Sequence, residues 1–165
     1  MALARLSERC ASLAGQQRGR SVHVRDFGPD DVGGVLRLEE RCFDADLRYP
    51  RWLFELYAAR GAVFRVAVLG QEVVGYVIAD VEGGLCHVIS IAVDPEHRAT
   101  GIGTALLCSA VEECRRRGTS KARLEVSVDN LPALRLYEKL GFEAAALLRD
   151  YYGRGRDAYL MVADV

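Results

Sequence analysis

Short runs of apolar residues recur along the chain, and they repeat with two different periods. Period-two or continuously apolar runs, which indicate strands, cover residues 21–27, 63–68, 73–81, 86–93 and 121–128, and two more lie within residues 144–165 around a glycine-containing turn. Spacings of three and four residues, which indicate helices, cover residues 28–43, 51–61, 101–117 and 132–142. The predicted order is therefore β-α-α-β-β-β-α-β-α-β-β.

This order predicts an α/β fold with a mixed sheet and a βαβ unit in its second half. Turn and capping residues support the boundaries, because Pro132 lies in the first turn of one predicted helix and Gly118 and Gly141 follow the ends of two. A chain of 165 residues suits one domain. We expect residues 1–20 to form a flexible tail and residues 21–165 to form the domain.

Composition narrows the classes of function. The formal net charge of −1 gives no broad attraction to DNA or to an anionic membrane. No apolar run approaches the roughly 20 residues that span a bilayer. The five cysteines include no C-x-x-C pair, so we expect buried thiols in a reducing, cytoplasmic setting rather than a disulfide framework or a metal site.

The segment "HRATGIGTALL", residues 97–107, places two glycines at the start of the longest predicted helix. A helix N-terminus attracts anions, and Gly101 and Gly103 would let a phosphate approach the backbone, with Arg98 in front of them. The alternative is a tight turn that only packs the helix against the sheet. A P-loop is excluded because Gly103 is followed by Thr104, and a dinucleotide fingerprint fails because Leu106 holds its third glycine position.

Together with "SIAVDPEHRATGIGTALL" and "VDNLPALRLYEKLGF", this segment resembles the acetyl-CoA signature R/Q-x-x-G-x-G/A of the GCN5-related N-acetyltransferase (GNAT) family. The resemblance runs from about residue 21 to residue 161. It implies a mixed, mostly antiparallel sheet, splayed at its central parallel strands and flanked by about four helices, with acetyl-CoA as cosubstrate. The cofactor-binding residues that it implies are Ile91, Ala92, Val93, Arg98, Ala99, Thr100, Gly101, Ile102, Gly103, Thr104, Asn130 and Tyr137.

Strand parity and the same resemblance nominate catalytic residues. Parity places His87, Ile89, Ile91 and Val93 on one face of their strand, and Arg123, Glu125 and Ser127 on one face of theirs. The family's nascent-chain N-terminal acetyltransferases carry "H-x-x-S-x-A-V" and "L-E-V" at matching places, which implies Glu125 as base with His87 assisting, directly or through water.

The resemblance also implies that Tyr137 is the general acid. The alternatives are an exposed ion pair for Glu125, a hydrogen-bonded strand histidine for His87, and a core aromatic for Tyr137. Asn130 has a helix-capping alternative of its own.

Two further segments, "ADLRYPRWLFELY" and "DYYGRGRDAYLM", resemble the nascent-chain enzymes specifically. They imply a substrate groove formed by Ala45, Leu47, Tyr49, Tyr151 and Tyr152; cross-strand packing is the alternative for the tyrosine pair. The implied activity is acetylation of the α-amino group of protein N-terminal peptides, nascent chains at the ribosome included, by a monomer or weak dimer. The alternatives are acetylation of a ribosomal-protein N-terminal alanine, acetylation of a small-molecule amine, and acetyl-CoA binding without turnover.

Overall fold

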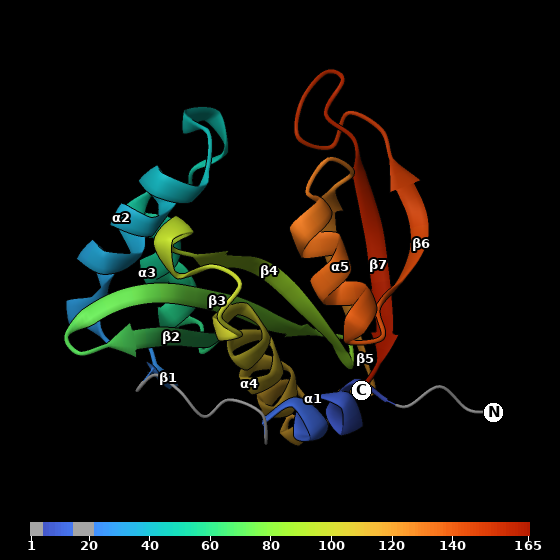
Figure 1. Ribbon diagram of the computed structural model, residues 1–165, viewed down its shortest axis with the longest axis horizontal. Helices are drawn as coiled ribbons and strands as arrows, with labels where there is room; N and C mark the ends of the chain where they lie inside the picture. The colour runs from blue at the N-terminus through green and yellow to red at the C-terminus, as the bar shows by residue number, and fades with distance from the viewer. Residues whose placement is uncertain (1–4, 15–21) are drawn as a thin grey trace.

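A seven-stranded mixed sheet organises the computed structural model of the chain, which describes residues 5–14 and 22–165 (Figure 1). The strand order is β1-β2-β3-β4-β5-β7-β6. The strands are β1 (Val22–Asp26), β2 (Val63–Leu69), β3 (Glu72–Glu82), β4 (Leu85–Val93), β5 (Lys121–Ser127), β6 (Glu143–Leu148) and β7 (Ala158–Asp164). Every neighbouring pair is antiparallel except β4 and β5, which confirms the predicted mixed sheet.

The parallel pairing of β4 with β5 is short. It joins Leu85 to Lys121 and ends at Val88 and Leu124, although both strands continue beyond that point. From there the two strands separate, as Figure 1 shows between β4 and β5. The sheet is therefore splayed at its central parallel strands, as the resemblance implied.

Helices cover both faces of the sheet. They are α1 (Leu6–Ala14), α2 (Val32–Cys42), α3 (Arg51–Ala59), α4 (Ile102–Arg116) and α5 (Leu131–Lys139), with 3₁₀ turns η1 (Pro29–Asp31), η2 (Ala45–Leu47) and η3 (Pro95–His97). One apolar cluster contains the buried residues of α4, including Leu106 and Leu107, together with Leu6 of α1 and Tyr137 of α5. A second cluster contains Phe54 of α3 and the buried residues of α2. The sheet thus separates two cores.

A bulge in β4 changes which side chains face each core. Ile78 of β3 pairs with Ser90, but the next residue of β3 pairs with Val88, so Ile89 is the extra residue. An extra residue shifts the alternation by one position. Ile91 and Val93 therefore pack against the α4 cluster, whereas Ile89 packs against the α2 and α3 cluster. The prediction that these three residues share a face was wrong.

The N-terminal segment corrects a second expectation. Residues 6–14 form a helix rather than a tail, because Leu6, Cys10 and Leu13 repeat at helical spacing and pack against the core beside α4. Residues 1–4 and 15–20 of the predicted tail lie outside the described residues. Among the described residues the helices thus number five instead of about four.

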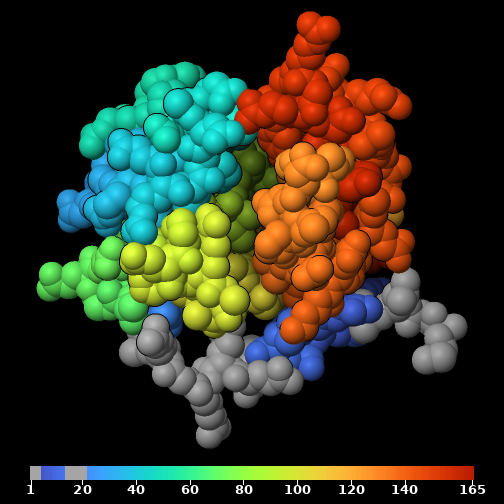
Figure 2. Space-filling model, turned by 45° about the horizontal axis from the view of Figure 1, so that its top comes forward, coloured from blue at the N-terminus to red at the C-terminus, as the bar shows by residue number. Residues whose placement is uncertain are grey.

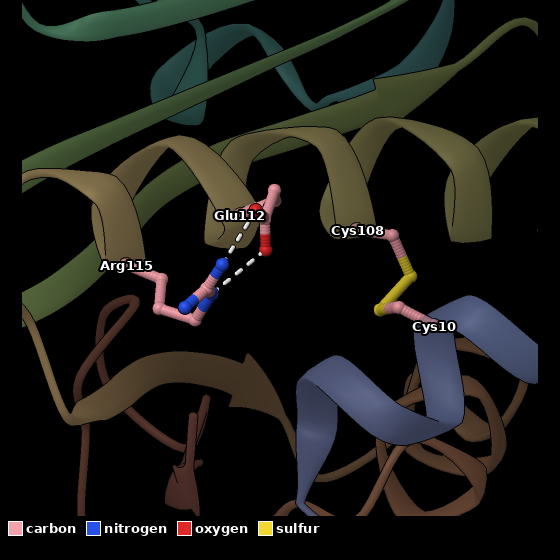
Figure 3. The surroundings of a disulfide bond; sticks show 4 residues. All are labelled: Cys10, Cys108, Glu112 and Arg115. Atoms are coloured by element: carbon pink, nitrogen blue, oxygen red, sulfur yellow. Dashed lines mark hydrogen bonds and ion pairs between the residues drawn. A yellow bond between two sulfur atoms is a disulfide. The ribbon is translucent and has the colours of Figure 1, made fainter.

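Two of the five cysteines are not thiols. Cys10 of α1 and Cys108 of α4 form a disulfide, which ties the two helices together (Figure 3). Their Cα atoms are 5.5 Å apart because the apolar stripe of α1 lies on α4, and that distance is typical of a bridged pair. The expectation of free thiols was wrong for this pair, while Cys42, Cys86 and Cys114 are free.

No helix in the described part of the chain has the length and apolarity needed to cross a membrane. Within residues 5–14 and 22–165, no group of three or more histidine, cysteine or acidic side chains is arranged to hold a metal ion.

Candidate active site

Two adjoining cavities lie where β4 and β5 separate. One, of about 540 Å³, borders the start of α4, and the other, of about 620 Å³, lies between the α2–α3 segment and the β6–β7 loop. Figure 2 shows this hollow between the cyan and the orange-red segments, with β4 at its floor. Four residues line both cavities: Phe43, Ile91, Asn130 and Tyr137. A reaction between two bound molecules would take place at this junction.

The first cavity is built from the glycine-containing turn. Gly101, at the N-cap of α4, has a φ of +86°, a left-handed conformation that glycine adopts without strain. Arg98 lies beside it, and its Nε donates to the Val93 carbonyl at 3.0 Å. Most of the predicted cofactor-binding residues line the two cavities, but Thr100 does not, because its hydroxyl turns back to the His97 carbonyl. Asn130 also caps α5 through the Ala133 amide.

The composition of this wall fits a diphosphate joined to an extended chain. An α-helix leaves its first amide groups without partners inside the helix, and its dipole adds positive potential there. Gly103 leaves this wall without a side chain, and a β-carbon there would lie within contact distance of Leu136, at 3.4 Å. Apolar residues of β4 and α5 continue the cavity toward the junction. Acetyl-CoA has this combination, because its pyrophosphate is followed by an extended, uncharged pantetheine arm that carries the thioester.

The second cavity has an aromatic wall. Leu47, Tyr49, Tyr151 and Tyr152 line it as expected, whereas Ala45 does not. The Tyr151 and Tyr152 rings meet edge to face at 4.9 Å, and the Tyr152 hydroxyl donates to the backbone carbonyl of Glu125 at 3.3 Å. Burial raises the pKa of Tyr49 and of Tyr152 to about 12, so both hydroxyls stay protonated at neutral pH. The Tyr49 hydroxyl therefore offers a hydrogen-bond donor on an apolar ring, whereas the Tyr152 hydroxyl donates its proton to the Glu125 carbonyl and is left to accept.

Glu125 and His87 are brought together from neighbouring strands. The His87 Nε2 and Glu125 Oε2 atoms are 2.8 Å apart, and both side chains are largely buried. Of the two, Glu125 lines the second cavity and His87 does not. An exposed ion pair, the alternative considered for Glu125, does not match this burial.

Tyr137 occupies the junction of the two cavities. It projects from α5, is buried, and meets Phe142 edge to face at 5.9 Å. Burial raises its pKa well above the usual range, so the hydroxyl holds its proton at neutral pH. Tyr137 therefore packs in the core and also places a protonated hydroxyl at the junction.

A buried carboxylate in the wall escaped the sequence analysis. Glu39 of α2 is only 2% exposed and lines the second cavity. It accepts hydrogen bonds from the Tyr49 amide and the Tyr76 hydroxyl, and Tyr76 in turn lies 2.8 Å from Ser90. Burial is the main cause of the raised pKa of Glu39. Its place on the apolar stripe of α2, four residues after Val35, was the signal in the sequence.

An ion-pair cluster across the second cavity was also missed. Arg156, from the β6–β7 loop, contacts Asp46 at 2.6 Å and Asp44 at 3.3 Å, both in the α2–α3 loop. More than 100 residues separate these partners in the sequence, so spacing gave no signal. The contacts join the two segments that flank the hollow in Figure 2.

Comparisons with known proteins agree with this geometry. The chain is 35% identical to an N-alpha-acetyltransferase of Sulfurisphaera tokodaii, with 92% of this chain and 98% of that protein covered. It is 30% identical to a putative [ribosomal protein bS18]-alanine N-acetyltransferase of Bacillus subtilis, over 84% of this chain and 92% of that one. Its fold matches Ard1 from Thermoplasma volcanium with a TM-score of 0.81 at 29% identity, over 88% and 98% of the two chains.

The model of the Acetyltransferase (GNAT) family matches residues 33–142, which include both halves of the β4–β5 opening and the turn before α4. Most of the chain thus carries the family pattern, and acetyl-CoA is the acetyl donor of that family. The chain belongs to the GNAT family and is an acetyltransferase.

Proposed function

We propose that the chain transfers the acetyl group of acetyl-CoA to the free α-amino group of protein N-terminal peptides. The observation that carries this proposal is the placement of Glu125 and Tyr137 on one cavity, whose remaining wall is rich in tyrosine. The relatives named N-alpha-acetyltransferase support it. The α2–α3 loop and the β6–β7 loop would hold the peptide between them.

The chemistry needs a neutral amine and a proton for the departing thiolate. The amine nitrogen attacks the thioester carbonyl carbon, so that a C–N bond forms and the C–S bond breaks. Glu125, assisted by His87, takes the amine proton, and the Tyr137 hydroxyl donates to the sulfur. The diphosphate would lie against the turn formed by residues 98–104, with the arm along β4.

The acceptor's own acidity favours an α-amine. An α-amino group has a pKa near ~8, whereas a lysine side chain has one near ~10.4. At neutral pH, removing the proton therefore takes about 1–1.5 kcal/mol for the α-amine and roughly 4–5 kcal/mol for lysine. A carboxylate base is adequate for the first and poorly matched to the second.

The test is thiol release from acetyl-CoA with peptides that differ in their first two residues, run beside the free amino acids. We expect acetylation of peptide α-amines, and loss of at least about tenfold in kcat for both E125Q and Y137F with acetyl-CoA binding unchanged. E112Q, which alters an exposed carboxylate on α4, is the control and should keep full activity. Unchanged turnover in E125Q and Y137F would remove their assigned roles.

A second candidate is acetylation of one ribosomal-protein N-terminal alanine, which the Bacillus subtilis relative favours. The same peptide panel separates the two. Activity restricted to a single ribosomal N-terminus would select the second function, and activity on free amines alone would contradict both.

A further inference from the structure

Both ring nitrogens of His87 have partners. Nε2 lies 2.8 Å from Glu125 Oε2, and Nδ1 lies 3.4 Å from Arg123 Nη2. A guanidinium group can only donate hydrogen bonds, so Nδ1 must accept. The single proton of a neutral imidazole then sits on Nε2 and is donated to Glu125. For a neutral ring, the Arg123 contact is therefore compatible with one tautomer only.

The parallel register of the sheet holds Arg123 in this place. His87 of β4 and Arg123 of β5 are direct partners in the last stretch where the two strands are paired. Glu125 follows Arg123 by two residues on the same face and lies just beyond the end of the pairing. Arg123, His87 and Glu125 therefore form a continuous chain of contacts that ends at the acceptor cavity, which only Glu125 among them lines.

We infer that Arg123 is a positioning residue that selects the tautomer of His87, and that His87 positions Glu125 rather than accepting the substrate proton itself. Neither ring nitrogen is available to an acceptor amine. Glu125, held by Nε2–H, presents its remaining oxygen to the cavity. This inference rests on the proposed function and refines it, because it assigns the proton to Glu125 alone.

A competing acid gives Arg123 a second effect. Glu82 Oε2, on β3, lies 3.2 Å from Arg123 Nη2 and 3.7 Å from His87 Nδ1. Without the guanidinium, this carboxylate would favour a proton on Nδ1 and hence an imidazolium between Glu82 and Glu125. An imidazolium would hold the Glu125 carboxylate more tightly and weaken it as a base.

The other titratable groups around the ring are an aspartate paired with an arginine and tyrosines whose hydroxyls stay protonated. Asp80 is the β3 register partner of His87, and it is paired with Arg60 at 3.3 Å. The charges of Asp80 and Glu82 act on the pKa of Tyr57 of α3. The charges of Glu125 and Arg123 act on the pKa of Tyr151. Both tyrosines have pKa values raised mainly by burial, so they stay neutral across the pH range of the test.

The experiment measures the tautomer of His87 and the pH dependence of kcat/KM in wild-type protein and in R123M. Long-range ¹H–¹⁵N spectra of the free protein should show the proton of wild-type His87 on Nε2, with Nδ1 unprotonated, at pH 7. In R123M we expect a proton on Nδ1 as well, and an acidic limb of kcat/KM that moves to higher pH. The expected fall in kcat/KM at pH 6.5 is about threefold or more, with KM for acetyl-CoA unchanged.

Two further variants separate positioning from a general effect of charge. K121M removes a cation on the same strand that pairs with Asp164, and it should leave both the spectrum and the profile unchanged. R123M/E82Q removes the competing acid as well, and it should return His87 to the Nε2–H form and the acidic limb to its wild-type position.

Either of two results would overturn the inference. One is a wild-type His87 with its proton on Nδ1, which the wild-type spectrum alone reveals, whether or not any variant folds. The other is an R123M protein with an unchanged spectrum and profile. The spectra need no acceptor peptide, so failure of this inference is distinguishable from failure of the proposed acetylation of N-termini.

Discussion

Single residues at the cavity wall determine what can bind, and a glycine does so because it has no side chain. Gly103 lies in the first turn of α4 on the wall of the first cavity. A β-carbon there would meet Leu136 at 3.4 Å and Val93 at 3.7 Å, which are ordinary contact distances within the protein. The protein could therefore accept a methyl group at this position, whereas a ligand lying on the wall could not.

The substitution G103A should therefore leave folding stability unchanged or improved while it weakens the binding of acetyl-CoA. We expect the free energy of unfolding to stay within about 0.5 kcal/mol of wild type or to rise, because alanine favours helix over glycine. The Kd for acetyl-CoA should rise at least about tenfold, since the methyl group occupies the diphosphate wall. Urea unfolding and isothermal titration calorimetry measure the two quantities.

The control is G33A. Gly33 lies in α2 away from both cavities, and a β-carbon added there would meet nothing within 4 Å outside the helix's own backbone. This variant should gain helix stability and keep the wild-type Kd. Wild-type affinity in G103A would show that the ligand does not lie against the start of α4.

Residues of the site could be predicted from the sequence where both the chemistry of a side chain and its position in a regular pattern pointed to them. Glu125, with apolar neighbours on both sides in β5, and the glycines before α4 were visible in the sequence, and the structure places them on the two cavities. Arg123 was placed on the correct strand face, but its contact with His87 depends on the register of two strands far apart in sequence. No pattern within either strand carries that register.

At the scale of elements, periodicity predicted every strand and four of the five helices within the described residues, because their apolar stripes are regular. It failed at α1, whose arginine- and serine-containing sequence resembles a tail. It also failed inside β4, where the bulge at Ile89 reverses the alternation without any turn residue to mark it. Both failures come from tertiary packing. Packing selects a helix over a tail at α1 and a bulge over regular alternation in β4, and the local sequence fits either alternative.

The entry to α2 shows how an element end is fixed by charge. Asp31 is the last residue of η1, is 7% exposed, and accepts from Arg25 of β1 at 2.7 and 2.9 Å and from the Gly28 amide at 2.7 Å. The hydrogen bond from Arg25 is the main cause of the lowered pKa of Asp31. A carboxyl group whose pKa is lower in the folded state contributes stability above its unfolded pKa and loses it as pH falls through the folded pKa.

We therefore expect D31N to lower the free energy of unfolding by about 1–3 kcal/mol at pH 7. The difference from wild type should shrink as pH falls below about 4 and through the folded pKa of Asp31, because the wild-type carboxyl then becomes neutral too. Urea unfolding at a series of pH values measures it. The exposed neighbour Asp30 provides the control, D30N, and an equal loss in both variants would contradict a specific role of the Arg25 contact.

At the scale of the whole molecule, the separation of β4 and β5 opens the sheet and places both cavities at one junction. The two parts on either side of the opening are held together by the short parallel pairing, by the apolar cluster around α4, and by the Arg156 contacts. The disulfide lies elsewhere, between α1 and α4, and neither cavity is lined by α1. We therefore expect that breaking the disulfide changes the free energy of unfolding without changing the reaction at the junction.

The last prediction tests that separation. Cys10 and Cys108 are 98 residues apart, and a cross-link that closes so long a loop restricts the unfolded chain strongly. Reduction, or the C10S substitution, should lower the free energy of unfolding by about 2–5 kcal/mol while changing kcat/KM by less than about twofold. Thermal unfolding with and without reductant measures the first effect, and C10S, which has no bridge to reduce, should be insensitive to reductant. A loss of activity that parallels the loss of stability would mean that α1 supports the junction through α4, and that the two ends of the molecule act as one unit.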